Sequence, residues 1–314
     1  MNSRLQKLLW PTGPQGSGLE IGALDSPLLR KPEHDVLYVD YATTEVVRAN
    51  QFDPAVRLEQ IVEVDIVWGS ARLAEAVGRP VDYVLASHVI EHVPDLIGWL
   101  LEVAEVLRPE GVLGLAIPDK RFTFDALRQV SVLSEAVEAH LLGAKRPSLR
   151  QVYDVASLGI GVDAAEVWGN RFDPAARRDE VLARLRPALN LVTSLHASPQ
   201  YRDAHCWVFT PRTFLTVAEE LATLALFPFR ISAFYPTETG DAEFLVRLVR
   251  ADPNDPAIRA DLRAARSELS PEQPSDSTAA ATIEILSRRL AAIEGSRSWK
   301  ATAPLRALRR WFSR

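Results

Sequence analysis

The sequence predicts an α/β protein: a doubly wound domain on a seven-stranded, mostly parallel sheet whose last strand runs antiparallel. Strand and helix patterns alternate through the first half of the 314 residues, as parallel strands joined by crossover helices require. The final two strand patterns are separated only by the short link Pro236–Glu243, which favours an antiparallel hairpin. The expected strands are Leu19–Ala23, Val36–Asp40, Ile61–Val67, Tyr83–Ser87, Val112–Ile117, Phe229–Tyr235 and Phe244–Val249.

Amphipathic stretches between these strands predict the helices. Ala71–Val77 and Leu96–Leu107 separate the third, fourth and fifth strands. A later helix is expected over Pro211–Ala225, because Thr210 suits an N-cap and the proline after it suits a first turn. Residues 120–205 break the alternation, since they are polar, favour helix and exceed an ordinary crossover in length. We interpret them as an inserted helical cap over the carboxyl edge of the strands, where a ligand would bind.

The composition changes after about residue 252. Residues 1–251 should therefore form the main domain, and residues 252–278, rich in Pro, Ser, Asp and Ala, a linker with room for one helix. Residues 279–314 follow as a helical appendage. Within it, apolar residues at spacings of 3, 4 and 3 give residues 279–294 a coiled-coil-like seam. This seam fits a homodimer contact and, equally, a helix that docks on its own domain.

The end of the chain, residues 296–314, is a basic amphipathic tail. It carries six cations and no acid, interleaved with tryptophan, leucine and phenylalanine. This pattern is typical of an interfacial helix on anionic lipid, and a disordered basic end is the alternative. Because the whole chain has a net charge of −5, the part outside this tail carries −11. A body this acidic argues against nucleic acid as a partner.

The overall composition, with 47% hydrophobic and 25% charged residues, is that of a soluble globular protein. The single cysteine, Cys206, excludes an intramolecular disulfide and a cysteine-built zinc site, and fits a reducing compartment. No apolar run approaches the ~18 residues needed to span a bilayer. We therefore expect a cytoplasmic protein whose basic tail contacts the inner face of the cell membrane.

The strongest single pattern lies in residues 18–40, where an apolar strand ends in a glycine turn and the next strand ends in a carboxylate. Gly22 lets the backbone approach a ligand closely. Asp40, about 20 residues further on, can accept both hydroxyls of a ribose. A dinucleotide site needs more glycines around its pyrophosphate, which Asp25 and Pro27 would repel and obstruct. The pattern thus favours a phosphate-free, cationic cofactor, S-adenosylmethionine, over a nicotinamide or flavin nucleotide.

A wider set of motifs resembles the class I S-adenosylmethionine-dependent methyltransferases, which have a Rossmann-like fold. The motifs are Glu20 with Gly22, Asp40, Asp65, the Ser-His-Val-Ile-Glu-His-Val stretch at 87–93 and the Leu-Arg-Pro-Glu-Gly-Val-Leu stretch at 107–113. The resemblance covers about residues 15–250. Residues 19–24, 117–125 and 205–211 are similar to a bacterial branch associated with polysaccharide biosynthesis. One departure is Leu24, which stands where this family usually has a second glycine.

The resemblance implies roles for individual residues of the cofactor site. The implied contacts are Glu20, Gly22 and Ala23 beneath the cofactor, Asp40 at the ribose, Tyr41, Asp65 and Ile66 at the adenine, and Ser87 and His88 near the sulfonium. Methyl transfer then depends mainly on positioning, with a base added where the acceptor is a hydroxyl.

Histidines are the candidates for that base. His88, Glu91 and His92 share a face through their i, i+3, i+4 spacing, and His205 returns to the same edge after the insertion. We expect catalysis to involve His92 or His205 as base, with Asp119 at the acceptor pocket. The same four residues, His88, Glu91, His92 and His205, are the ligands of an alternative with a divalent cation, which the sequence favours less. A purely structural role is the third alternative.

The polar edge and the resemblance together lead us to expect O-methylation of a sugar hydroxyl on a glycan or glycolipid precursor. Phe122 and Phe124 suit stacking on a pyranose ring, and Trp168, Asn170 and Tyr201 are further candidates for sugar contacts. A small aromatic or a quinone is the alternative acceptor. A non-catalytic scaffold in a glycan-assembly complex is the alternative outside enzymes.

Overall fold

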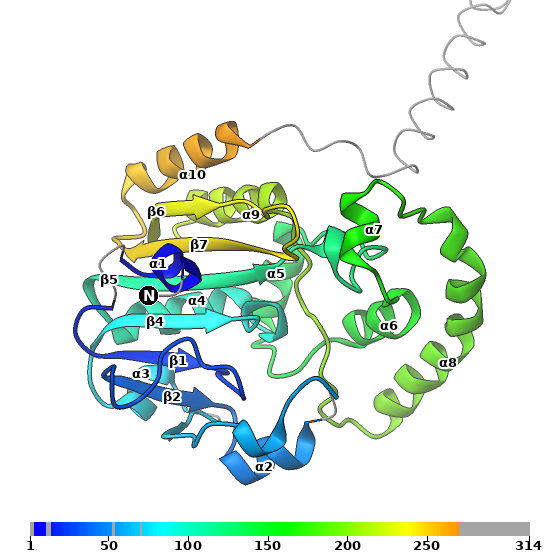
Figure 1. Cartoon of the computed structure of the whole chain (residues 1–314), viewed down its shortest axis with the longest axis horizontal. Coiled ribbons are helices and arrows are strands. Elements are labelled where there is room, and N and C mark those ends of the chain that lie inside the picture. The colour runs from blue at the N-terminus through cyan, green and yellow to red at the C-terminus, as the bar shows by residue number, and fades with distance from the viewer. Residues whose placement is uncertain (1–2, 11–13, 52–53, 70, 270–314) are drawn as a thin grey trace, which may run out of the picture. The chain divides into compact units, whose positions relative to one another are not determined.

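A computed structural model describes residues 3–10, 14–51, 54–69 and 71–269. In this part of the chain, seven strands form one sheet in the order β3-β2-β1-β4-β5-β7-β6 (Figure 1). β1 to β5 are parallel, and β7 runs antiparallel to β5 and β6. The fold class and the hairpin predicted from the sequence are confirmed. The strands are β1 (Gly18–Ile21), β2 (Val36–Asp40), β3 (Ile66–Val67), β4 (Val81–Ser87), β5 (Leu107–Pro118), β6 (Phe229–Tyr235) and β7 (Glu243–Arg250).

The sheet brings the carboxyl ends of its central parallel strands to one edge. Ile21 of β1 lies level with Val39 of β2 and Ala86 of β4. Ser87, the last residue of β4, is level with Ala116 of β5. Ligands of an open parallel sheet bind beyond this edge, so the register defines where a site can form.

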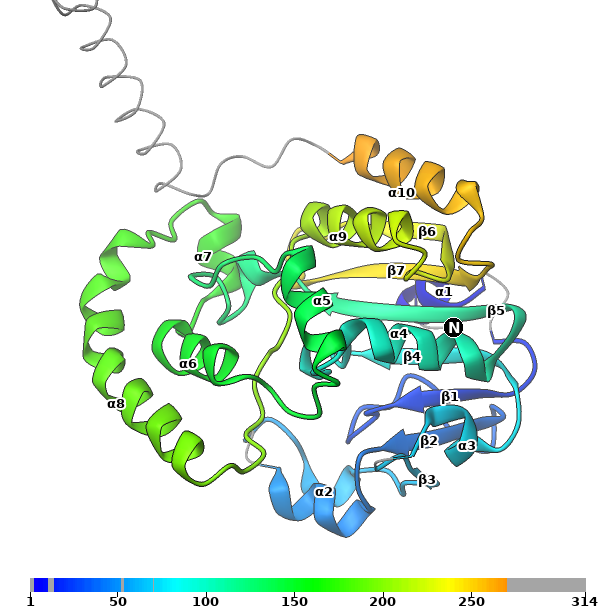
Figure 2. The ribbon, with the colours of Figure 1, turned by 180° about the vertical axis from the view of Figure 1, so that it is seen from behind.

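Helices cover both faces of the sheet. One face carries a helical layer that Figure 2 shows in front, and the opposite face carries α1 (Ser3–Leu8), which packs on β5 and β7. Alternate residues of β4 divide between two cores: Val84 and Ala86 join the larger one under the helical layer, whereas Tyr83 and Leu85 join the smaller one under α1. The layer consists of α3 (Leu73–Val77), α4 (Leu96–Val106), α5 (Leu133–Leu141), α9 (Pro211–Thr223) and α10 (Pro256–Glu268).

Side chains that cap the first backbone N–H groups define where α9 and α4 begin. Thr210 accepts a hydrogen bond from the Thr213 N–H of α9 and forms a capping box with that residue, so the predicted N-cap is confirmed. Asp95 caps α4 by accepting from the Gly98 N–H at 2.8 Å. Among the described helices, none combines the length and apolar character needed to cross a bilayer.

The insertion at 120–205 contributes to two parts of the structure. α5 packs between α4 and α9 with Ala136 fully buried, and so completes the main helical layer. The remaining helices, α6 (Leu149–Leu158), α7 (Ala164–Trp168) and α8 (Arg178–Ala197), lie beyond the carboxyl ends of β4 and β5 (Figure 1). α6 packs along α8 in this lobe. α2 (Thr44–Asn50) follows the carboxyl end of β2.

Two boundaries differ from the sequence prediction. β3 is only Ile66–Val67, because the backbone N–H groups before it bond elsewhere: Val62 donates to the Leu24 carbonyl and Val64 to the Thr44 hydroxyl. Residues 252–269 are not linker, since α10 packs on α9 and β6 with Leu262 fully buried. The expected dimer seam at 279–294 and the basic tail at 296–314 lie outside the described residues.

Candidate active site

The turn after β1 is built around two residues with left-handed backbone. Gly22 has φ +65° and Leu24 has φ +45°, and the Gly22 N–H donates to the Val39 carbonyl at 3.0 Å. A Cβ on Gly22 would lie 2.9 Å from Val89 Cγ2, closer than side chains normally pack. The glycine is therefore required both by the backbone conformation and by the approach of the loop after β4. Ala23, half-buried beside it, continues the turn.

Glu20 holds this loop in place from within β1. Its carboxylate is buried and accepts hydrogen bonds from the Leu28 N–H at 2.6 Å and the Leu29 N–H at 3.1 Å. Burial raises the pKa of Glu20 to about 7, although the two N–H groups oppose this change. Glu20 thus acts on the cofactor edge by shaping the loop.

Asp40 ends β2 at the same edge. Its Oδ1 accepts from the Tyr41 N–H at 2.7 Å, and burial raises the pKa of the Asp40 carboxyl above its usual value. The Tyr41 side chain is exposed next to it. Asp40 and Tyr41 fit the expected contacts with a ribose and with the adenine ring next to it. This edge is therefore suitable for an adenosine-containing cofactor.

Asp65, which the resemblance assigns to the adenine, is engaged with other residues. Asp65 precedes β3 instead of following it, and its carboxylate is held by Lys31 Nζ at 2.6 Å and by the Tyr38 N–H at 2.7 Å. Ile66 pairs with Val39 inside the sheet. The residue that follows β3 at the carboxyl edge is Trp68, whose N–H donates to the Asp40 carbonyl at 2.8 Å. No motif in the sequence marks this tryptophan as part of the edge.

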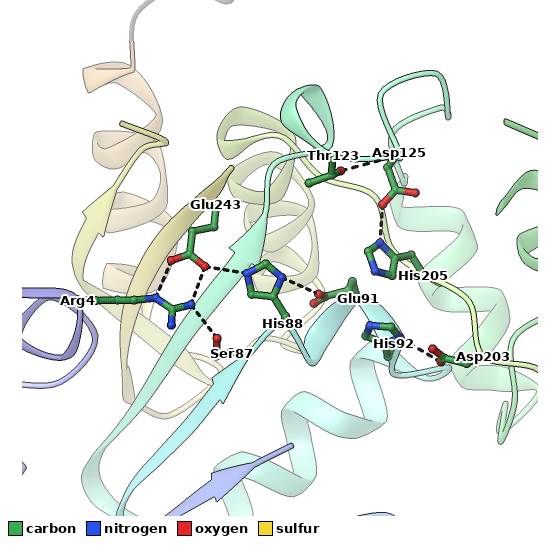
Figure 3. Close-up of polar contacts among 10 residues, drawn as sticks. All are labelled: Arg4, Ser87, His88, Glu91, His92, Thr123, Asp125, Asp203, His205 and Glu243. Carbon is green, nitrogen blue, oxygen red and sulfur yellow. Dashed lines mark hydrogen bonds and ion pairs between the residues drawn. The ribbon is translucent and has the colours of Figure 1, made fainter. Parts of the chain in front are cut away.

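After β4, Ser87 and His88 join a network that no sequence pattern indicates (Figure 3). Arg4 of α1 contacts both carboxylate oxygens of Glu243 at 2.6 Å and donates to the Ser87 hydroxyl at 2.8 Å. His88, with φ +54°, places Nε2 at 2.7 Å from the same Glu243. Burial raises the pKa of Glu243, but its hydrogen bonds with His88 and Arg4 outweigh burial and lower the pKa overall.

Two histidine–aspartate pairs lie next to each other beyond β4. His92 Nδ1 is 3.0 Å from Asp203 Oδ1, and His205 Nδ1 is 2.5 Å from Asp125 Oδ2. The two imidazole rings meet edge to face with centroids 4.7 Å apart. Arg128 holds the other oxygen of Asp125 at 2.6 Å. The prediction that His205 returns to the edge of His92 is therefore confirmed in position, and each ring has its Nδ1 turned to a carboxylate.

In both pairs the charge of the partner changes the pKa. Burial lowers the pKa of His92, but the hydrogen bond and the negative charge of Asp203 outweigh it, so the pKa of His92 is raised overall. For Asp125 and Asp203, burial raises the pKa of each carboxyl, yet the histidine partners lower it below the usual range. Both aspartates are therefore ionised at neutral pH and keep their histidines oriented.

Glu91 lies on the same turn as His92 and is buried. Its backbone carbonyl accepts from the Cys206 N–H at 2.5 Å and the Trp207 N–H at 3.2 Å. These bonds hold the segment that follows His205 next to Glu91. Ligand atoms of Glu91, His92 and His205 lie within 4.8 Å of one another. His88, the fourth residue of the predicted group, has Nδ1 3.6 Å from Glu91 Oε1 on the other side.

The prediction that Asp119 faces the acceptor is not supported by its surroundings. The side chain is fully buried, and its carboxylate accepts from Arg121 Nη2 at 2.5 Å and from the Thr237 hydroxyl at 2.7 Å. It also accepts from the Arg121 N–H, as the cap of the short 3-10 turn Lys120–Phe122. Asp119 is thus a buried anchor after β5, because tertiary contacts with residue 237 cover it.

The aromatic residues expected at the acceptor divide into two groups. Phe122 is buried and stacks on Trp168, with ring centroids 4.3 Å apart and planes 15° apart, so these two faces are already covered. Phe124 is partly exposed and lies against His205 at 4.5 Å between centroids. Tyr201 is exposed and donates its hydroxyl to Asp203 at 3.2 Å. Asn170 is exposed and has φ +53°.

Comparison with known proteins bears on this edge. The family model described as "Methyltransferase domain" matches residues 17–113, the segment that contains β1 to β4 and the turns with Gly22, Asp40 and His88. The match covers the part of the chain that forms the candidate cofactor edge. The cofactor of such a domain in this fold is S-adenosylmethionine, and the residues at the edge fit it: one glycine turn, a carboxylate for the ribose and no cradle for a pyrophosphate.

The solved structures that this chain is similar to are distant from it in sequence. A protein described as a zinc-dependent alcohol dehydrogenase from Rhodobacter sphaeroides is 13% identical, with a TM-score of 0.43 over 80% of this chain and 90% of its own. A methyltransferase from Methanosarcina mazei is 13% identical, with a TM-score of 0.36 over 80% and 98%. The N-methyltransferase NodS from Bradyrhizobium japonicum is 11% identical, with a TM-score of 0.35 over 79% and 84%. A search among curated proteins gave no sequence match.

Proposed function

We propose that this methyltransferase transfers the methyl group of S-adenosylmethionine to a hydroxyl group of a sugar, in a glycan or a glycolipid precursor. The observation that carries the proposal is the cluster of Glu91, His92 and His205 beyond β4, with each histidine held by a carboxylate. The oxygen of a neutral hydroxyl is a weak nucleophile until its proton leaves, whereas the nitrogen of a neutral amine is nucleophilic without losing a proton first. Groups that activate a hydroxyl are therefore what an O-methyltransferase needs at this edge.

The surroundings of the cluster support a sugar as the acceptor. Phe124 and Tyr201 present exposed aromatic surface beside the two histidines, and Asp203 adds a partly exposed carboxylate. Flat apolar rings next to hydrogen-bond acceptors suit the alternating C–H and O–H surface of a pyranose. A small aromatic acceptor would use the rings but make no use of the exposed part of the Asp203 carboxylate.

In the proposed reaction the acceptor oxygen attacks the methyl carbon, the bond between carbon and sulfur breaks, and the hydroxyl proton leaves. Bound S-adenosylmethionine supplies the electrophilic methyl group. The chain's own residues shape the cofactor edge through Glu20, Gly22 and Asp40, and they activate the hydroxyl through the cluster. Orientation of the two reactants contributes a large part of the rate, because methyl transfer is an in-line displacement.

The test measures transfer of a labelled methyl group from S-adenosylmethionine to an envelope extract that contains glycans and lipid-linked glycan precursors. We expect the label in O-methyl sugars after hydrolysis, and its loss with the variant His205→Gln. The matched control is His140→Gln on α5. It removes a similar histidine–aspartate pair, with Asp95 at 3.0 Å, which does not belong to the cluster of Glu91, His92 and His205. Label in a quinone, a small aromatic or nucleic acid would overturn the sugar assignment. Failure to bind S-adenosylmethionine in calorimetry would favour the non-catalytic scaffold.

A further inference from the structure

We propose that Glu91, His92 and His205 form a binding site for one divalent transition-metal ion. The sequence pattern by itself favoured a site without metal. Three features of the folded site shift that balance: a buried carboxylate without a hydrogen bond, two histidines whose free nitrogens are set by carboxylates, and an opening on one side of the cluster. For its role in the reaction, the inference rests on the proposed function.

The first feature is Glu91. Its side chain is 1% exposed, and among the described residues neither carboxylate oxygen has a hydrogen-bond partner. His88 Nδ1 lies 3.6 Å from Oε1, which is too far for a hydrogen bond. A buried carboxylate without hydrogen bonds is costly, and buried charges are normally paired or coordinate a metal. A cation at the cluster would remove this cost.

The second feature is the orientation of the histidines. Asp125 accepts a hydrogen bond from His205 Nδ1 and Asp203 accepts one from His92 Nδ1, so the Nε2 atom of each ring carries the free lone pair. Carboxylates that hold Nδ1 in this way are the usual outer partners of histidines that bind a metal through Nε2. Arg128 in turn fixes Asp125 at 2.6 Å. The arrangement thus supplies the first ligands and also the groups that orient them (Figure 3).

The third feature is the asymmetry of burial. The side chains of Glu91 and His205 are 1% and 10% exposed, whereas those of His92 and Asp203 are 35% and 58% exposed. An ion held by the three ligands would be enclosed on the protein side and reachable from the other. Three protein ligands with open positions are typical of catalytic metal sites, whereas structural sites are closed by four.

The donor set indicates the kind of ion. Two imidazole nitrogens and one carboxylate oxygen suit Mn²⁺, Fe²⁺, Co²⁺ or Zn²⁺, whereas Mg²⁺ and Ca²⁺ prefer oxygen ligands throughout. In the proposed reaction the ion would bind the acceptor hydroxyl and lower its pKa. The hydroxyl proton then passes to solvent, the oxygen forms its bond to the methyl carbon, and the carbon–sulfur bond breaks.

The experiment measures metal binding directly on the full chain. The protein is stripped with a chelator and titrated with Mn²⁺, and the loss of the electron paramagnetic resonance signal of free Mn²⁺ counts the bound ions. Calorimetric titrations with Co²⁺, Zn²⁺ and Mg²⁺ give the order of affinities. We expect one bound ion per chain, with Mg²⁺ the weakest, and a Co²⁺ absorption spectrum that indicates nitrogen ligands.

Variants test the assignment of the ligands. Glu91→Gln and His92→Gln should weaken Mn²⁺ binding by at least ~10-fold, and Asp203→Asn by about 10-fold through the orientation of His92. His140→Gln is the matched control, because within the described part of the chain its pair with Asp95 belongs to no group of three such ligands, and it should leave Mn²⁺ binding unchanged. Should Glu91→Gln fail to fold, the partly exposed His92 and Asp203 still test the site.

Absence of stoichiometric binding for all four ions would overturn the proposal, and so would binding that Glu91→Gln and His92→Gln leave unchanged. The metal site and the proposed function fail separately. Transfer of label to sugars by metal-free protein in the presence of a chelator would refute the role of the ion in the reaction and leave sugar methylation intact. Tight Mn²⁺ binding with label in another acceptor would refute sugar methylation and leave the site intact.

Discussion

Arg4 and Glu243, 239 residues apart in sequence, form a two-point ion pair at the carboxyl edge of the sheet, with both nitrogen–oxygen distances 2.6 Å. Through this pair the N-terminal helix reaches Ser87 and His88 at the end of β4. Arg4 therefore connects α1, which packs on one face of the sheet, to the residues at the carboxyl end of β4. Such two-point pairs are stronger and more directional than single contacts.

We predict that Arg4→Ala lowers the free energy of unfolding by about 1–3 kcal/mol, because it leaves a largely buried Glu243 without its main cation. The control is Lys7→Ala on the same helix, whose pair with Glu238 is more exposed and should cost below about 0.5 kcal/mol. Urea unfolding of both variants measures the difference. Equal losses would mean that the Arg4 pair is an ordinary surface contact.

Glycine variants separate backbone strain from ligand access. Gly22 and Gly78 have similar left-handed φ values of +65° and +69°, so alanine at either position should cost about 1 kcal/mol of stability. Only at Gly22 does a Cβ meet a neighbour, Val89 Cγ2 at 2.9 Å, whereas Gly78 has open space. We expect Gly22→Ala to weaken S-adenosylmethionine binding at least ~10-fold, and Gly78→Ala to leave it unchanged, as measured by calorimetry. Similar affinities for the two variants would remove Gly22 from the cofactor edge.

Asp40 and Asp65 give a second matched comparison. Asp40→Asn should weaken S-adenosylmethionine binding by roughly 10-fold, because a charged acceptor at the ribose is lost. Asp65→Asn should leave the affinity unchanged and cost at most about 1 kcal/mol of stability, since its carboxylate serves Lys31 and the Tyr38 N–H. A large loss of affinity with Asp65→Asn would reinstate the original prediction for that residue.

Glu20 should make the stability of the fold depend on pH. Burial raises the pKa of Glu20 from 4.5 to about 7, so between these values the folded protein binds more protons than the unfolded chain. Stability then falls as the pH rises through this window, by up to about 3 kcal/mol from this residue. Urea unfolding from pH 4.5 to 8 should show this slope in the native chain and a shallower one in Glu20→Gln. Parallel pH profiles would contradict the assignment.

The packing of α10 is tested through one buried leucine. Leu262 is fully buried against the core, so Leu262→Ala should destabilise the domain by about 2–4 kcal/mol. Arg259→Ala on the exposed side of the same helix should change stability by less than about 0.5 kcal/mol. If Leu262→Ala were as mild as Arg259→Ala, residues 252–269 would behave as the linker that their composition suggested.

Several parts of the site could be predicted from neighbouring residues alone. The apolar run of β1, the turn at Gly22 and the carboxylate at Asp40 appear where the sequence placed them, because each depends on local backbone needs. The fifteen residues from Val81 to Asp95 likewise give a buried strand and its turn. The predicted bounds of β3 were wrong because they depended on distant residues. Val62 and Val64 have strand-like character, but their N–H groups bond to Leu24 and Thr44.

The sequence by itself thus determined the sheet, its order of elements and the cofactor edge, since hydrophobic periodicity and turn chemistry act over short distances. Only the tertiary structure decided which polar groups meet: His92 with Asp203, His205 with Asp125, and Arg4 with Glu243 are separated by 111, 80 and 239 residues. It also decided that Asp119 is buried and that Glu91 is left without a hydrogen bond. Pairing between distant side chains depends on the packing of whole elements, and no local pattern encodes it.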